Sequence, residues 1–313
     1  MNHKHRDVLV FGAGGFIGSS AVRRLRENGW NAIAYTRQDC DLTDAEAVKK
    51  VFAQRAEPCR VLLCGCVSRH FEDSFATMVK NIAMVENFVR AAQPGQVISC
   101  VYLSSTDIYG NHPALPVTEA TAALPEYYYG ASKLANETLL LRAGLTDYPV
   151  TCLRLPGIYG PTDQGHSILG MFARRVLRGQ ELTVFGDGGT LRDFVLVTDL
   201  CAIIEGLFER PHHGVLNVAT GQSMKLLDIL HLLADTAGCG LNLRYAPPGL
   251  RSHDLVFDNR ALLAAMGAEL ALTPLAEGAK ILIDSLLAEA AANANTTEGG
   301  AQNATAKLCK ETA

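Results

Sequence analysis

Tyr129 and Lys133 are the two side chains of this sequence whose types and spacing best suit acid–base chemistry. They stand four residues apart, and on a helix this spacing places both on one face. A tyrosine titrates near pH 10, so proton exchange near neutrality requires its phenolate to be stabilised by about 3 pH units, equal to roughly 4 kcal/mol. Because a lysine ammonium one helical turn away supplies part of this stabilisation, we expect Lys133 to make the phenol more acidic.

Hydroxyl groups follow an apolar run that begins at Val97 and is typical of a strand over residues 97–104. Ser105 and Thr106 come directly after this strand, and the carboxylate of Asp107 follows them. Open α/β sheets bind ligands at the carboxyl ends of their strands. A tyrosine and a lysine at helical spacing are common by chance, but together with hydroxyls at such an edge they predict an active site.

Three glycines, Gly12, Gly15 and Gly18, lie where the first predicted strand (residues 7–12) passes into the first predicted helix (15–28). A pyrophosphate binds backbone N–H groups at a helix N-terminus, where side chains would block its approach. Glycines also occur in tight turns that bind nothing. Their position between a strand and an amphipathic helix favours a dinucleotide-binding turn.

The end of the second predicted strand (31–36) indicates which dinucleotide binds. An acid about 20 residues beyond the glycines usually accepts the free ribose 2′-hydroxyl of NAD, but Thr36 and Arg37 occupy that place here. A guanidinium pairs well with a phosphate, so the sequence favours NADP(H), with NAD(H) as the alternative. Asp41 and Leu42 are placed to meet the adenine, although Asp41 could equally cap a helix that starts near Thr43.

Strand-length apolar runs alternate with amphipathic helices through the first half of the chain. Strands are predicted at residues 7–12, 31–36, 61–66, 97–104 and 150–155, and helices at 15–28, 44–54, 74–92 and 129–143. This alternation predicts an α/β fold with a doubly wound, mostly parallel Rossmann sheet. In such a fold the cofactor lies across the carboxyl edge of the sheet.

After Pro156 the pattern loosens, and glycines and prolines separate the helical segments. We predict an NADP-binding domain of residues 1–156, completed by about 195–220, and a smaller, interleaved substrate-binding subdomain of residues 157–194 and 221–287. Returning strands are expected at 195–197 and 215–218. Residues 288–313, rich in Ala, Asn, Thr and Gly, are expected to be disordered.

The composition excludes several classes of protein. The 313 residues are 48% hydrophobic and 19% charged, with a net charge of −4, which argues against a disordered chain and against nucleic-acid or anionic-membrane partners. Without a membrane-length apolar stretch or a leader peptide, we expect a cytoplasmic protein. Cys64 and Cys66 form a C-x-C without a second pair, and the histidines lack ligand spacing, so no metal site is expected.

These motifs occur together with others in a characteristic order along the chain. They are the glycine turn with Phe16 and Ile17, Asp41-Leu42, Asn81, Ser-Ser-Thr-Asp-Ile-Tyr-Gly (104–110), Tyr-Gly-Ala-Ser-Lys (129–133), Arg-Leu-Pro-Gly-Ile-Tyr-Gly-Pro (154–161), Phe-Gly-Asp-Gly (185–188), Arg-Asp-Phe-Val (192–195), Asp199 and Asn217. In this order they resemble the extended short-chain dehydrogenase/reductases, in the branch called the NAD-dependent epimerase/dehydratase family. The resemblance covers about residues 7–287.

The resemblance implies roles for individual residues. Tyr129 would be the general acid/base, Lys133 its partner and a ribose ligand, and Ser105 the hydroxyl that binds the reacting oxygen. The cofactor contacts are then Gly12, Gly15, Phe16, Ile17, Gly18, Arg37, Asp41, Leu42, Lys133 and Pro156, and the substrate contacts are Thr106, Asp107, Arg192 and Arg251. The two arginines would reach the diphosphate of a nucleoside-diphosphate sugar, and the pairing of subunits in relatives implies a homodimer.

The sequence also departs from the family pattern. The family's dehydratases carry Asp then Glu where this chain has Thr106 and Asp107, which argues against dehydration. Gly157 stands where a substrate-contacting Asn is frequent, and Leu196 where a His is usual. Both departures weaken the assignment of a nucleotide sugar. Gly65 and Cys66 replace two alanines beside the cofactor but remain small.

The residues and the resemblance together predict an NADP(H)-preferring enzyme. We expect it to reduce a ketone of a nucleotide-activated sugar, because NADPH is the cofactor that net reductions usually consume, whereas an epimerase regenerates its cofactor. A 4-epimerase of sugar nucleotides is an alternative, because the same residues serve if the hydride returns to the other face of a transient ketone. Further alternatives are an NADPH reductase of a non-nucleotide ketone and a non-catalytic protein that senses NADP(H).

Overall fold

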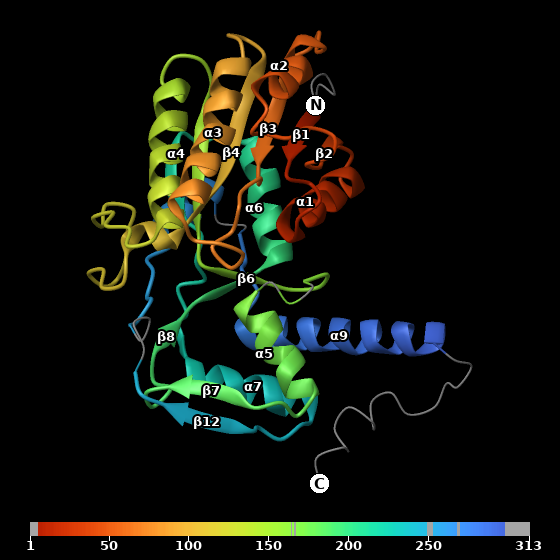
Figure 1. Ribbon diagram of the computed structural model, residues 1–313, viewed down its shortest axis with the longest axis vertical. Helices are drawn as coiled ribbons and strands as arrows, with labels where there is room; N and C mark the ends of the chain where they lie inside the picture. Colours follow the sequence, from red (N-terminus) through yellow and green to blue (C-terminus); the bar gives the residue numbers. More distant parts are fainter. Residues whose placement is uncertain (1–5, 164, 166, 249–252, 268–269, 298–313) are drawn as a thin grey trace. The chain divides into compact units, whose positions relative to one another are not determined.

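A computed structural model describes residues 6–163, 165, 167–248, 253–267 and 270–297 of the chain. The chain forms two compact units (Figure 1). The first unit draws on Met1–Pro156, Thr198–Val218 and Asp258–Leu270, and the second unit draws on Gly157–Val197, Ala219–Phe257 and Ala271–Ala313. Each unit therefore contains segments from distant parts of the sequence.

The first unit is built on a six-stranded parallel sheet, so the predicted α/β class is confirmed. Its strands are β1 (Asp7–Phe11), β2 (Asn31–Tyr35), β3 (Cys59–Leu63), β4 (Val97–Ser105), β5 (Val150–Leu155) and β10 (Gly214–Asn217), in the spatial order β10-β5-β4-β3-β1-β2. The chain winds outward from β1 in two directions, toward β2 on one side and β3 on the other. The carboxyl ends of β1 and β3 are therefore the topological switch point, where such sheets bind ligands.

Helices cover both faces of this sheet (Figure 1). They are α1 (Phe16–Glu27), α2 (Ala45–Ala53), α3 (Phe75–Ala91), α4 (Tyr128–Gly144), α6 (Val197–Glu209) and the short α8 (Arg260–Met266). Successive side chains of β1 alternate between the faces: Leu9 and Phe11 join a core cluster with Phe52 of α2 and Phe88 of α3. Val8 and Val10, which point to the other face, are equally buried at 0% exposure. Burial on both faces explains the continuous apolar character of these strands.

Local hydrogen bonds set where the helices begin. The side chain of Ser74 accepts the backbone N–H of Thr77, and the Thr77 side chain accepts the N–H of Ser74, so a capping box starts α3. Asp44 caps α2 by accepting the N–H groups of Glu46 and Ala47. The alternative that Asp41 caps this helix is therefore wrong, because the helix begins later than Thr43 and Asp44 is the residue within reach.

Within its described residues, the second unit contains three short strand pairs and three helices. β6 (Gly157–Tyr159) pairs with β9 (Phe194–Leu196), β7 (Leu182–Phe185) with β12 (Leu243–Ala246), and β8 (Leu191–Arg192) with β11 (Met224–Lys225). Its helices are α5 (Ile168–Leu177), α7 (Leu226–Ala237) and α9 (Leu275–Thr297). One core cluster joins them, with Leu169, Leu233 and Ile283 fully or almost fully buried.

Two expectations for the later part of the chain need correction. The strand expected at 195–197 becomes β9, which pairs with β6 instead of returning to the main sheet, whereas the strand expected at 215–218 does return as β10. Residues 288–297, expected to be disordered, form the last turns of α9, because their alanines favour helix and continue a helix anchored at Leu282 and Leu286. The remainder, 298–313, lies outside the described residues.

None of the helices within the described ranges is both long and apolar enough to cross a membrane.

Candidate active site

The glycine turn after β1 is a close-packed backbone cradle. Gly12 has φ +86°, and a Cβ on it would lie 2.6 Å from the backbone nitrogen of Gly65, which follows β3. A Cβ on Gly18 would lie 2.3 Å from the carbonyl oxygen of Gly12. The start of α1 therefore sits directly on the strand ends at the switch point, and any side chain at these two positions would force them apart.

The first turn of α1 suits an anion. Its N-cap residue, Gly15, has no side chain that could cap the turn, and the turn contains no acidic residue. The first N–H groups of a helix have no partner within the helix, so those of Phe16, Ile17 and Gly18 are suited to bind phosphate oxygens. The residues present at this turn fit the pyrophosphate of a dinucleotide.

The turn after β2 carries Arg37 at its rim, with 87% of the side chain exposed. Arg37 Nε lies 3.1 Å from Asp41 Oδ2, and Asp41 Oδ1 accepts the N–H and the hydroxyl of Thr43 at 2.9 and 2.7 Å. The hydrogen bonds from Thr43, reinforced by Arg37, hold the pKa of Asp41 below its usual value. Leu42 is buried, with its side chain close to Gly65. Of the two predicted adenine contacts, Asp41 thus holds its own turn and Leu42 packs beside the strand ends.

The two predicted hydroxyl groups at the end of β4 differ in their hydrogen bonds. Ser105 Oγ accepts the backbone N–H of Asp107 at 3.1 Å, which leaves the Ser105 hydroxyl proton to donate elsewhere. Thr106 donates its hydroxyl to the carbonyl oxygen of Leu155 at 3.2 Å. Thr106 therefore ties β4 to the end of β5, next to Pro156, and only Ser105 keeps its proton for a substrate oxygen.

Tyr129 and Lys133 lie in the first two turns of α4, and α4 is anchored to β4. Lys133 is 2% exposed, and its Nζ donates to the carbonyl oxygen of Leu103 at 2.6 Å. The same Nζ lies 5.4 Å from the centroid of the Tyr129 ring and 4.8 Å from that of Tyr102. Leu103 precedes Ser105 in β4, so the three predicted catalytic residues lie on two elements joined by this bond.

The electrostatic expectation for the phenol is correct in part. Burial raises the pKa of Tyr129 above its usual value, and the charge of Lys133 lowers the pKa without outweighing burial. Burial acts to lower the pKa of Lys133, whereas negative charge on Cys66, Tyr102 or Tyr129 acts to raise it, and the net direction is upward. Tyr129 is therefore protonated near neutrality in the free protein. It can donate a proton, and it needs additional positive charge before it can accept one.

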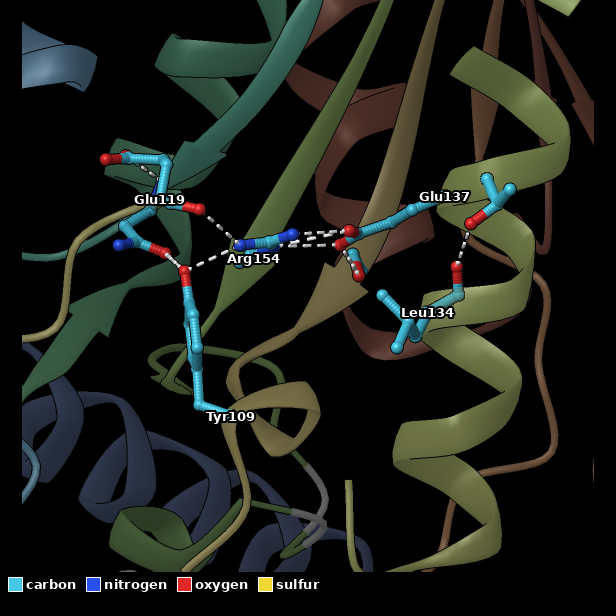
Figure 2. Close-up of polar contacts among 8 residues, drawn as sticks. Tyr109, Glu119, Leu134, Glu137 and Arg154 are labelled. Atoms are coloured by element: carbon cyan, nitrogen blue, oxygen red, sulfur yellow. Dashed lines mark hydrogen bonds and ion pairs between the residues drawn. The ribbon is translucent and has the colours of Figure 1, made fainter. Parts of the chain in front are cut away.

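A buried polar network lies behind these residues (Figure 2). Arg154 of β5 donates to both carboxylate oxygens of Glu137 in α4, with a shortest N–O distance of 2.7 Å, and Ser104 donates to Glu137 at 2.5 Å. Arg154 Nη1 also donates to Tyr109 Oη at 2.8 Å, and Tyr109 donates to Asn217 of β10 at 2.7 Å. The network thus fixes α4, which carries Tyr129 and Lys133, to the strands that end at the same edge.

Two contacts made by the segment after β3 were not predicted. Arg69 Nη1, in the segment after β3, lies 2.9 Å from Asp107 Oδ1. Asp73 Oδ1 accepts the backbone N–H of Tyr129 at 2.8 Å. Asp73 precedes a predicted helix and is of a residue type that caps helices, which is a usable signal, but the sequence does not indicate that it binds α4 instead of α3. Nothing local links Arg69 to Asp107.

Of the two predicted diphosphate contacts, Arg192 belongs to the second unit. Arg192 ends β8, and its Nη1 donates to the carbonyl oxygens of Leu191 and His253 at 2.7 and 2.6 Å, while burial lowers its pKa. Arg251 lies outside the described residues. A Cβ on Gly157 would lie 2.5 Å from the ring of Phe194, its partner across β6 and β9. Phe194 thus occupies the space that a side chain at position 157 would need.

Comparison with known proteins gives consistent matches. Residues 8–219 match the model of the NAD dependent epimerase/dehydratase family. GDP-6-deoxy-D-mannose reductase of Pseudomonas aeruginosa is 28% identical over 78% of this chain and 84% of its own. UDP-glucose 4-epimerase of Mycolicibacterium smegmatis is 26% identical over 78% of this chain and 86% of its own.

A solved structure extends this similarity to the fold. UDP-glucose 4-epimerase of Thermus thermophilus in complex with NAD superimposes with a TM-score of 0.79 and 26% identity. The match covers 89% of this chain and 98% of the other. The similarity therefore includes both units and not the parallel sheet alone.

Proposed function

The chain belongs to the NAD dependent epimerase/dehydratase family, and from this premise we propose that it is an NADPH-dependent ketoreductase of nucleotide-activated sugars. The observation that carries the proposal is the position of Tyr129 beside the buried Lys133 Nζ, on a helix bonded to the strand that ends at Ser105. A proton donor and a hydroxyl donor on joined elements are the groups that carbonyl reduction requires.

The chain's own groups account for the proton chemistry. When bound, the dinucleotide donates or accepts the hydride. Ser105 donates its free hydroxyl proton as a hydrogen bond to the reacting oxygen and so stabilises the negative charge that develops there. Tyr129 delivers its proton to that oxygen in reduction. Lys133 stabilises the phenolate that remains, and its bond to Leu103 keeps it in place.

The exposed position of Arg37 supports NADP(H) as the cofactor. Its guanidinium stands at the end of β2, where the ribose 2′-group of a dinucleotide lies in this fold. Asp41 already pairs with Arg37, but the pair is largely exposed and weak. A 2′-phosphate carries more charge than Asp41 and can displace it.

The relatives support a nucleotide-sugar substrate. One relative is named as a reductase of this substrate class and another as a 4-epimerase, so epimerisation is the nearest alternative. A reductase of a non-nucleotide ketone is a second candidate, which the packing of Phe194 on Gly157 favours. Phe194 fills the space beside position 157, so this position has no polar side chain where the family frequently has an Asn that contacts the substrate.

Cofactor titration and ligand screening test the proposal. In a fluorescence titration of the purified chain, we expect NADPH to bind at least about tenfold more tightly than NADH, since charge-assisted bonds to a phosphate are strong. UDP-, GDP-, CDP- and dTDP-sugars are then screened by thermal shift, where a ligand at 100 times its Kd adds about 2.7 kcal/mol. Equal binding of the two cofactors would contradict the NADP(H) assignment, and no shift with any nucleotide sugar would favour the non-nucleotide ketone.

Replacement of Tyr129 tests the mechanism separately. Tyr129→Phe removes the proton donor and is expected to lower turnover by about 10²–10⁴-fold, with the affinity for NADPH almost unchanged because the glycine turn is intact. If the variant kept wild-type turnover, the assigned proton donor would be wrong. If it lost NADPH binding as well, the loss of activity would not identify a proton donor.

A further inference from the structure

An ion pair joins the segment after β3 to the end of β4, beside the proposed proton donor. Arg69 Nη1 lies 2.9 Å from Asp107 Oδ1, and the two side chains are 17% and 19% exposed. Because this pair is partly buried, water and salt screen the attraction between its charges less than they would in an exposed pair. Each charge therefore has a stronger effect on the other.

Further contacts hold Arg69 and its segment against the start of α4. The guanidinium carbon of Arg69 lies 5.6 Å from the centroid of the Tyr127 ring, within the range of a cation–π contact. Asp73, from the same segment, accepts the backbone N–H of Tyr129 at 2.8 Å. Arg69 therefore approaches Asp107 from an element that is itself fixed to the helix of the phenol.

The backbone of Asp107 contacts both Ser105 and the helix that carries Tyr129. Its N–H donates to Ser105 Oγ at 3.1 Å. Its carbonyl oxygen is packed on α4, where a Cβ on Gly130 would lie only 2.7 Å away. The negative charge of Asp107 acts to raise the pKa of Tyr129, so a positive charge paired with the carboxylate favours proton exchange at the phenol.

We propose that Arg69 is a positioning residue that holds the Asp107 carboxylate in an ion pair, so that Asp107 does not repel negative charge on Tyr129. This inference rests on the proposed function, because it takes Tyr129 as the group that exchanges the proton. Arg69 acts through Asp107 and need not touch the substrate.

The charges around Tyr129 determine the sign of the effect. Burial raises the pKa of the phenol, Lys133 lowers it, and Cys66, Tyr102 and Asp107 raise it. Loss of Arg69 removes the positive charge that lies 2.9 Å from Asp107, so the pKa of Tyr129 rises. Loss of the Asp107 charge leaves Arg69 uncompensated, so the pKa falls. Loss of both cancels most of the change.

A double-mutant cycle measured as a pH profile tests these signs. Reverse oxidation of GDP-6-deoxy-D-mannose with NADP⁺ requires the phenolate of Tyr129 as proton acceptor, so the acid limb of kcat/KM follows its pKa. We expect Arg69→Met to move this limb up by about 0.5–1 pH unit and Asp107→Asn to move it down by a similar amount. The double variant should return close to wild type, and Arg69→Lys, which keeps the charge, should move it least.

A second measurement does not depend on the choice of substrate. The tyrosinate absorbance of each variant in complex with NADP⁺ is titrated with pH, and the titration of the same variant carrying Tyr129→Phe is subtracted. The difference reports Tyr129 alone. If Arg69→Met does not fold, the downward shift expected for Asp107→Asn in this titration still tests the proposal.

The outcomes separate the inference from the function on which it rests. Opposite shifts that cancel in the double variant support the role of Arg69, since a merely structural defect would not change sign. Shifts in one direction only, or none, overturn it while leaving the reductase intact. Full turnover by Tyr129→Phe would instead overturn the proposed function itself.

Discussion

Two arginine–carboxylate pairs of the first unit have the same chemistry and opposite surroundings. Arg154 and Glu137 are 8% and 3% exposed at their side chains, whereas Arg37 and Asp41 are 87% and 32% exposed. The first pair joins β5 to α4 through bidentate bonds and is extended by Ser104 and Tyr109 (Figure 2). The second is a single contact within one turn.

The difference indicates what each pair is suited to do. A buried pair is costly to break, because either charge alone would remain in a poorly solvated site. It therefore suits a permanent role, such as fixing the helix of Tyr129 and Lys133 to the sheet. An exposed pair contributes little to stability, and its arginine can exchange one anion for another. Arg69 and Asp107, at 17% and 19% exposure, lie between these limits.

The largest effect is expected when the buried pair loses one member. Arg154→Met leaves the Glu137 carboxylate buried without its counter-ion, which costs about 3–5 kcal/mol of unfolding free energy. Urea unfolding measures this loss. The matched variant Glu137→Gln/Arg154→Met removes both charges and should recover most of it. If the single and double variants were equally unstable, lost packing would account for the effect better than an isolated charge.

Local signals predicted most elements of the fold. The helix expected over 74–92 is found as Phe75–Ala91, because Ser74 and Thr77 form a capping box that is visible in the sequence. The strand expected over 61–66 is instead Cys59–Leu63. The small residues from Cys64 onward continue the apolar pattern of the strand, so the pattern extends the predicted strand to include them. The chain leaves the sheet where Gly65 approaches Gly12. That approach depends on tertiary structure, which no local pattern contains.

The site divides in the same way. Tyr129 and Lys133 could be predicted from spacing within one helix, and the glycine turn from spacing within one strand–helix junction. The partners that hold them could not, since Glu137 meets Arg154, and Arg69 meets Asp107, only when separate elements pack together. The effect of burial on Tyr129 was missed for the same reason, because a helix position does not state how much chain covers it.

A smaller effect is expected at the far end of the buried network. Tyr109→Phe removes a hydroxyl that accepts from Arg154 and donates to Asn217. Asn217 is 0% exposed, so its side-chain oxygen loses its donor at a fully buried position, at a cost of about 1–3 kcal/mol. Thermal unfolding measures this cost. No loss would show that the network tolerates an unsatisfied member and is less cooperative than the buried pair suggests.

At the exposed pair, the expected effect is on affinity and not on stability. Arg37→Ala removes the proposed partner of the 2′-phosphate and should weaken NADPH binding by about tenfold, or roughly 1.4 kcal/mol, with little change for NADH. Asp41→Asn, the matched variant, frees Arg37 and should strengthen NADPH binding slightly. Fluorescence titrations measure both. A loss of NADPH and NADH affinity together in Arg37→Ala would mean that the turn, not the phosphate, had been disturbed.

The smallest effect is expected in the acid stability that Asp41 contributes. Its pKa is lowered in the folded protein, first by the hydrogen bonds from Thr43. A lowered carboxyl pKa stabilises the fold above the pKa of the unfolded chain, near 3.9, and this contribution disappears as the pH falls through the lower folded value. Because the group is partly exposed, the contribution should stay below about 1 kcal/mol. Melting temperatures of wild type and Thr43→Val should therefore differ slightly at pH 7 and converge well below pH 3.9. A difference that persisted at the lowest pH would assign the stabilisation to packing of Thr43 and not to the charge of Asp41.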